Sequence, residues 1–156
     1  MKRVVAVITF LLILLTIIIV MSQQRTFAGT ITIGGQKLVC QGYPVSKVRL
    51  LGGTPGANND GRVLIDPKVL RQEKLIVQKF IFFHECGHSY VGLSEYKADC
   101  WATQHGVKNK WLRLEDIPDI CLSFAGPSTS THPSGDSRCA NIYHCFSNER
   151  KQEAKK

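Results

Sequence analysis

The pentapeptide His84-Glu85-Cys86-Gly87-His88 combines two imidazoles and a carboxylate at spacings that suit hydrolytic chemistry. His84 and His88 are four residues apart, so on a helix they lie on one face and can share a tetrahedral metal ion. Glu85, next to the first histidine, would lie close enough to take a proton from a water held by that metal. The pentapeptide therefore predicts a metal site, with Zn²⁺ as the expected ion and Glu85 as the general base.

A catalytic zinc site has three protein ligands and an open position for water, so two histidines do not complete one. Glu95 and Asp99 follow downstream and, being four residues apart, share one face of a second predicted helix. This H-E-x-x-H…E-x-x-x-D arrangement resembles the gluzincin metallopeptidases. The resemblance implies that Glu95 is the third ligand. It also implies that Asp99 hydrogen-bonds a ligand histidine, which orients the imidazole and raises its basicity.

The spacing departs from that of thermolysin-like gluzincins, because only six residues separate the two predicted helices. The chain must turn sharply at Gly92, and Glu95 then stands at a helix N-terminus. The alternative third ligand is Asp99, with Glu95 at the rim of the site. The metzincin pattern is rejected because Val91 and Ser94 stand where that pattern requires a glycine and a histidine.

A weaker resemblance covers Thr131–Arg138, which is similar to the H-P…R element of CAAX-prenyl-protease-like gluzincins. It implies that His132 and Arg138 return to the site and stabilise the tetrahedral oxyanion or the metal-site carboxylates. The alternative is a loop histidine before a proline and an arginine on a helix surface. The pentapeptide together with Ala98–Ala102 is also similar to small exported bacterial proteins described as metallopeptidases.

The elements that would position these residues predict an α+β fold, a small antiparallel sheet followed by helices, of minimal zincin type. Glycine pairs and alternating residues predict a hairpin over residues 29–40 and short strands over 48–51 and 62–65. Residues 52–61 are rich in Gly, Pro, Asn and Asp and predict a loop. The strand at 62–65 is the candidate to offer its edge to an extended substrate, and the alternative is an ordinary edge strand.

Asp66, followed by a proline, is suited to begin a helix as its N-cap. The helical pattern continues, with a break near residues 72–74, through an apolar stretch into the pentapeptide, which predicts a largely buried helix. Ser94 can cap the next helix, and Gly106 is placed to end it. The remaining segments are expected as helices over residues 95–105, 111–114, 116–125 and 136–146, with a loop over 126–135.

The first 28 residues have the pattern of a targeting segment. Two basic residues precede Val4–Met21, an uncharged run of 18 residues that is longer than the usual apolar region of a signal peptide and barely long enough to span a bilayer. Small residues around Ala28 leave a cleaved signal peptide and an N-terminal membrane anchor as alternatives. Either one exports the rest of the chain. We therefore expect a domain at residues 29–148 and a basic tail at 149–156, in the periplasm or on the extracellular side of the inner membrane.

The net charge of the chain is +8. Lys2, Arg3 and Arg25 account for three of these charges, which leaves +5 from Gly29 onward. A solubilising basic tail explains this mild excess better than nucleic-acid binding does, so no nucleic-acid partner is expected. Attraction to an anionic membrane surface is compatible with the same charge.

All six cysteines lie in the expected exported domain. An even number of cysteines in an oxidising compartment predicts three disulfides, with fifteen possible connectivities. Cys139 and Cys145 are six apart on a predicted helix and face different sides, so we expect them to pair elsewhere. A cysteine-based zinc site is disfavoured because the sequence contains no C-x-x-C.

Taken together, these patterns predict an exported zinc-dependent metallopeptidase that acts on a peptide or protein substrate. Two alternative functions also include a zinc site. One is a zinc-stabilised binding protein without peptidase activity, and the other is an amidase that acts on cell-wall material. If the N-terminal segment is not cleaved, the membrane is a further partner.

Overall fold

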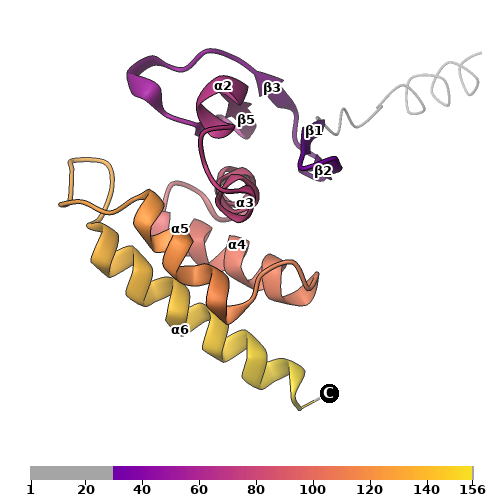
Figure 1. The fold of residues 1–156 in the computed structure, drawn as a ribbon, viewed down its shortest axis with the longest axis vertical. Helices are drawn as coiled ribbons and strands as arrows, with labels where there is room; N and C mark the ends of the chain where they lie inside the picture. Colours follow the sequence, from indigo (N-terminus) through magenta and orange to yellow (C-terminus); the bar gives the residue numbers. More distant parts are fainter. Residues whose placement is uncertain (1–29, 156) are drawn as a thin grey trace, which may run out of the picture.

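The computed structural model describes residues 30–155, and the predicted signal peptide or anchor at residues 1–28 lies outside them. The α+β class is confirmed. In Figure 1 the strands and the short helix α2 lie on one side of α3, while α4, α5 and α6 lie on the other. Within residues 30–155 every helix is too short or too polar to cross a bilayer.

The strands form two separate small sheets. Strands β1 (Thr30–Ile33) and β2 (Gln36–Val39) make the predicted antiparallel hairpin around a two-glycine turn. Strands β3 (Val45–Lys47), β4 (Gly56–Asn59) and β5 (Arg62–Ile65) form a sheet in the order β3-β5-β4. The β3–β5 pair is parallel and the β4–β5 pair antiparallel, so this second sheet is mixed.

The structure corrects three of the predicted strand and loop assignments. The strand expected at residues 48–51 lies instead at 45–47, where it pairs with β5. The expected loop at 52–61 contains β4, because Asp60 and Gly61, both at positive φ, make the two-residue turn of a β4–β5 hairpin. The candidate edge strand β5 is in fact central, with a neighbour on each side. The edge beside α3 belongs to β4.

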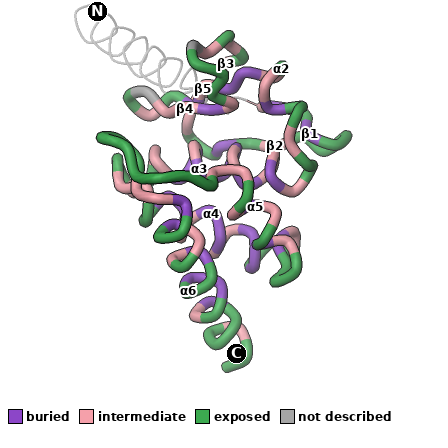
Figure 2. Tube along the Cα trace, turned by 60° about the vertical axis from the view of Figure 1, so that its left-hand side comes forward, coloured by how far each residue is buried: buried purple, intermediate pink, exposed green. Residues whose placement is uncertain are grey.

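Helix α2 (Pro67–Leu70) begins as predicted, because the Asp66 carboxylate accepts hydrogen bonds from two backbone N–H groups of its first turn. The chain breaks after it, and α3 (Leu75–Val91) carries the pentapeptide. Phe80 and Phe82 are almost fully buried, as are the sheet residues Val63 and Ile65 in the same core. Figure 2 shows buried residues along α3, along the helices α4 and α6 and in parts of the strands.

Helix α4 (Glu95–Lys108) is followed by a 3₁₀ turn (Leu114–Asp116), α5 (Ile117–Ser123) and α6 (Gly135–Glu153). Gly106 does not end α4, because it lies inside the helix. A Cβ there would come within 2.6 Å of the Leu112 side chain. The helix expected at 111–114 is absent except for the start of the 3₁₀ turn. Helix α6 runs into the predicted basic tail, where Glu149 is buried.

Three disulfides join the elements around α3. They connect Cys40 to Cys86, Cys100 to Cys145, and Cys121 to Cys139. The first joins the end of the β1–β2 hairpin to α3. The second joins α4 to α6, and the third joins α5 to α6. The prediction that Cys139 and Cys145 pair elsewhere is confirmed. Three disulfides in so small a domain are typical of an oxidising, exported environment.

Candidate metal centre

The two histidines of the pentapeptide point to one place on the same face of α3. Their Nε2 atoms are 3.1 Å apart. His84 is buried and His88 is half-buried. Nδ1 of His88 lies 2.8 Å from the backbone oxygen of Gly92, the residue that ends α3. The ring of His88 is therefore held through Nδ1, which leaves Nε2 for a ligand.

Glu95 joins the two histidines in a compact three-residue cluster. Its Oε2 lies 3.2 Å from Nε2 of His84, and its Oε1 lies 3.3 Å from Nε2 of His88. One ligand atom from each residue lies within 4.8 Å of the other two. Among the described residues the buried Oε2 has no hydrogen-bond partner. Two imidazoles and a carboxylate in this arrangement could hold a metal ion.

A tight connection between α3 and α4 brings Glu95 to the histidines. Gly92 adopts φ 78° and ψ −161°, which turns the chain at once, and the hydroxyl of Ser94 caps the new helix. The two helices approach closely at Gly87, where a Cβ would lie 3.1 Å from the backbone oxygen of Ala98. Gly87, an unspecified position of the H-E-x-x-H motif, is thus a residue that sequence reasoning missed.

Asp99 lies behind His84 and not beside the ligand atoms. Its Oδ1 is 2.8 Å from Nδ1 of His84, and its side chain is fully buried. A carboxylate on Nδ1 holds the proton there and leaves Nε2 free to bind a metal. Glu95 therefore lies beside the Nε2 atoms of the two histidines, whereas Asp99 contacts Nδ1 of His84. The alternative with Asp99 as third ligand would require its carboxylate to leave His84.

Arg138 from α6 contacts both carboxylates. Its Nε and Nη2 donate to the two oxygens of Asp99 at 2.9 and 2.7 Å, and its Nη1 lies 3.4 Å from Oε2 of Glu95. The guanidinium also lies over the ring of Phe124, 4.5 Å from the centroid. Arg138 is buried. Arg138 is expected to stabilise either the tetrahedral oxyanion or the metal-site carboxylates. These contacts favour the carboxylates.

His132 stands at the mouth of the site. Its Nε2 lies 3.7 Å from Oε1 of Glu95, and its side chain is 55 % exposed. It belongs to the exposed segment between α5 and α6, which Figure 2 shows in green. The contact with Glu95 does not fit a loop histidine unrelated to the site. An exposed imidazole there can reach a group that enters from solvent.

Burial and the neighbouring charges raise the pKa of some groups of the cluster and lower the pKa of others. Burial alone would lower the pKa of His84, but the carboxylates of Asp99 and Glu95 raise it to about 9. Burial opposes the ionisation of those carboxylates, yet the neighbouring cationic groups hold the pKa of both below the usual range. The pKa of Glu85 is raised by burial, against the opposing effect of the histidines. Glu85 is therefore the carboxylate best suited to accept a proton near neutral pH.

The cluster opens onto a cleft with two lobes. A cavity of about 430 Å³, the metal lobe, is lined by residues that include His88, Glu95, Leu93 and Thr131. A cavity of about 390 Å³, the apolar lobe, is lined by residues that include Phe80, Ile81, Phe124 and Pro127. Five residues line both lobes and mark their junction: Thr54, Gly56, His84, Glu85 and His132.

Strand β4 forms one wall of this cleft and is fastened to α3. Nδ2 of Asn58 donates to the backbone oxygen of Glu85 at 2.9 Å and to Oγ of Ser89 at 2.8 Å. Gly56 packs so closely that a Cβ would lie 2.9 Å from Cγ of Glu85. Sequence reasoning missed both residues because it placed them in a loop. The Asp60-Gly61 turn signal could have revealed the strand.

No protein-family model matches the chain, and the searches of curated proteins and of solved structures find no match either.

Replacing Arg138 with alanine should destabilise the metal-free fold. The change leaves the carboxylate of Asp99 buried without its main partner, which costs about 3–5 kcal/mol for a buried ion pair. Denaturant unfolding of the zinc-free, disulfide-intact protein measures this loss. The matched control is Arg113→Ala, an exposed arginine whose loss should cost within about 0.5 kcal/mol. Equal stability of the two variants would show that Asp99 does not depend on Arg138.

Proposed function

We propose that this protein is an exported zinc-dependent peptidase, with His84, His88 and Glu95 as the metal ligands. The observation that carries the proposal is the lining of the metal lobe. There a cluster of three candidate ligands, the carboxylate of Glu85 and the strand β4 all border the same space. Metal-dependent peptide hydrolysis requires a metal ion, a base and a place for an extended chain.

The geometry favours catalysis over a purely structural metal site. Structural zinc sites are closed, with four protein ligands, whereas catalytic sites have three and keep one position open. Three candidate ligands come together here, and all three line the metal lobe. A zinc-stabilised binding protein would not need Glu85, whose pKa is raised by burial, at the same junction.

A zinc ion held by His84, His88 and Glu95 would supply a Lewis acid for the scissile carbonyl and would lower the pKa of the attacking water. Glu85 takes the proton from that water and then delivers it to the leaving nitrogen. Asp99 holds the proton of His84 on Nδ1, and Arg138 holds Asp99 and Glu95 in place. His132, at the mouth, donates to the oxyanion that develops on the carbonyl.

The edge of β4 next to α3 is the proposed guide for the substrate. Among residues 30–155, strand β4 has β5 as its one strand neighbour, so an extended peptide can pair with its other edge. Side chains would alternate toward and away from the cleft, and the apolar lobe would accept a large apolar side chain next to the bond cleaved.

The test is a cleavage screen with full-length, zinc-loaded protein. The panel contains casein, a peptide mixture and peptidoglycan fragments, with products identified by mass spectrometry. We expect cleavage of peptide bonds that stops with a chelator and returns with Zn²⁺. Cleavage confined to amide bonds of wall fragments would instead support the cell-wall amidase. No cleavage by a protein with one zinc per chain would support the binding protein.

Replacing Gly56 with alanine should impair catalysis without loss of metal. The new Cβ would lie 2.9 Å from Cγ of Glu85 and 3.2 Å from Cγ2 of Ile81, so Glu85 must shift. A displacement of about 1 Å at a catalytic group can cost about 10²-fold, and we expect kcat/KM to fall by about that factor. Ala57→Gly, in the same strand, is the control and should change kcat/KM by only a few-fold. Unchanged kcat/KM in Gly56→Ala would show that Glu85 need not hold this position.

A further inference from the structure

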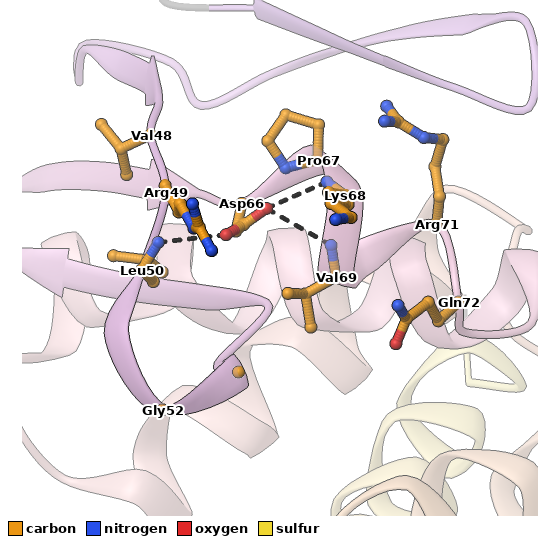
Figure 3. A pocket seen from close by; sticks show the side chains of 11 residues that line it. Val48, Arg49, Leu50, Gly52, Asp66, Pro67, Lys68, Val69, Arg71 and Gln72 are labelled. Atoms are coloured by element: carbon orange, nitrogen blue, oxygen red, sulfur yellow. Dashed lines mark hydrogen bonds between the residues drawn. The ribbon is translucent and has the colours of Figure 1, made fainter.

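A third cavity, of about 700 Å³, lies between residues 48–53 and the segment that begins α2. Three cationic side chains line this cavity, which we call the basic pocket: Arg49, Lys68 and Arg71. Figure 3 shows Arg49 and Arg71 toward opposite ends of it, with Asp66 between them. The mechanism above uses none of these residues.

All three cations of the basic pocket are exposed, and none forms an ion pair within 4.0 Å in the part of the chain that the structure describes. The one carboxylate in the lining, Asp66, accepts from the backbone N–H groups of Leu50, Lys68 and Val69 at 3.0–3.3 Å. Three cations and one carboxylate leave the lining with a net charge of +2, which suits an anionic ligand.

The charge of the whole strand layer agrees with this local excess. Residues 30–74, which precede α3, contain seven Lys and Arg against three Asp and Glu, a net charge of +4. Residues 75–148 contain six Lys and Arg against seven Asp and Glu, a net charge of −1. The positive potential is therefore concentrated on the side of the cleft that β4 forms, and an acidic chain would be drawn there.

The basic pocket adjoins the cleft. Gly52 and Gly53 line both the basic pocket and the apolar lobe. Gly53 is three residues from Gly56, which packs against Glu85, so an extended chain covers the interval in about 10 Å. A substrate paired with β4 would therefore bring a side chain about three positions from the bond cleaved to the edge of the basic pocket.

We propose that the basic pocket is an anion subsite of this cleft. This subsite selects peptides that carry an acidic residue two to four positions from the cleaved bond, on the side of the substrate that enters the apolar lobe. Arg49, Lys68 and Arg71 would attract the carboxylate, with Arg able to bind it through two N–H groups. This inference rests on the proposed peptidase function.

The test compares matched peptides cleaved by full-length, zinc-loaded protein. Each peptide carries one Glu, Gln or Lys at one of four positions on either side of the bond cleaved, with the rest unchanged. We expect Glu to raise kcat/KM about three- to tenfold over Gln at two to four positions on one side, and Lys to lower it. The preference should fall in 0.5 M salt, because exposed charges are screened at about 4 Å.

Two triple variants test whether the basic pocket causes the preference for Glu. Arg49→Gln/Lys68→Gln/Arg71→Gln should lose the preference for Glu but retain cleavage of the Gln peptide. The control is Lys110→Gln/Arg113→Gln/Lys151→Gln, three exposed cations outside all three cavities, which removes the same net charge and should retain the preference. No preference for Glu, or one that both variants lose equally, would overturn the proposal.

A binding measurement separates this inference from the proposed function. If no peptide is cleaved, fluorescence anisotropy with labelled Glu and Gln peptides still reports whether the pocket prefers the acidic one. A preference that the first triple variant loses would support the subsite even without catalysis, and equal binding would overturn it. If neither peptide binds but a short-chain phosphatidylglycerol does, and the first triple variant abolishes that lipid binding, the pocket is a site for lipid headgroups. That outcome would also overturn the proposal.

Discussion

Full-length protein purified with its disulfides formed should bind about one Zn²⁺ per chain, and Glu95→Ala should lose most of it. The carboxylate of Glu95 supplies one of the three candidate ligands, and its Oε2 has no hydrogen-bond partner in the described structure. Without it, two histidines remain, which is too few for a stable zinc site. Elemental analysis and titration against a chelator of known affinity measure the change.

Two further variants make the result specific. Asp99→Asn should keep one zinc per chain but bind it about 10- to 100-fold more weakly, because Asp99 acts on the metal through His84. Glu115→Ala, an exposed carboxylate in the 3₁₀ turn, should bind like the wild type. Zinc retained at full affinity in Glu95→Ala but lost in Asp99→Asn would reverse the roles of the two carboxylates.

Glu85→Gln should lower kcat/KM by about 10²- to 10⁴-fold while the zinc content stays the same. Glutamine keeps the size of the side chain and the hydrogen bond that the Glu85 backbone accepts from Asn58, but it cannot accept a proton from water. Because burial raises the pKa of Glu85, the acid limb of the wild-type profile of kcat/KM against pH should lie above pH 4.5. Activity should rise with pH through that limb, as Glu85 loses its proton.

The control for this prediction is Glu73→Gln, another glutamate close to α3 but outside the cleft lining, which should leave both kcat/KM and the pH profile unchanged. If Glu85→Gln retains full activity, Glu85 is not the base. If it has no effect while His84→Ala unfolds the protein, the metal is structural and the function lies in binding.

The local parts of the site could be predicted from the sequence because they depend on contacts a few residues apart. Four residues of helix bring His84 and His88 to one face, whatever surrounds them. Ser94 caps α4 through its own hydroxyl, and Asp66 caps α2 in the same way. The separation of Cys139 from Cys145 follows from the same helical geometry.

Only the tertiary structure decided how distant residues meet. Glu95 reaches the histidines because Gly92 turns the chain and Gly87 lets α4 approach α3. Arg138 reaches Asp99 across 39 residues of sequence, and β4 meets α3 through Asn58. Hydrogen-bond partners and disulfide pairs at such separations depend on the packing of whole helices, which no local pattern specifies.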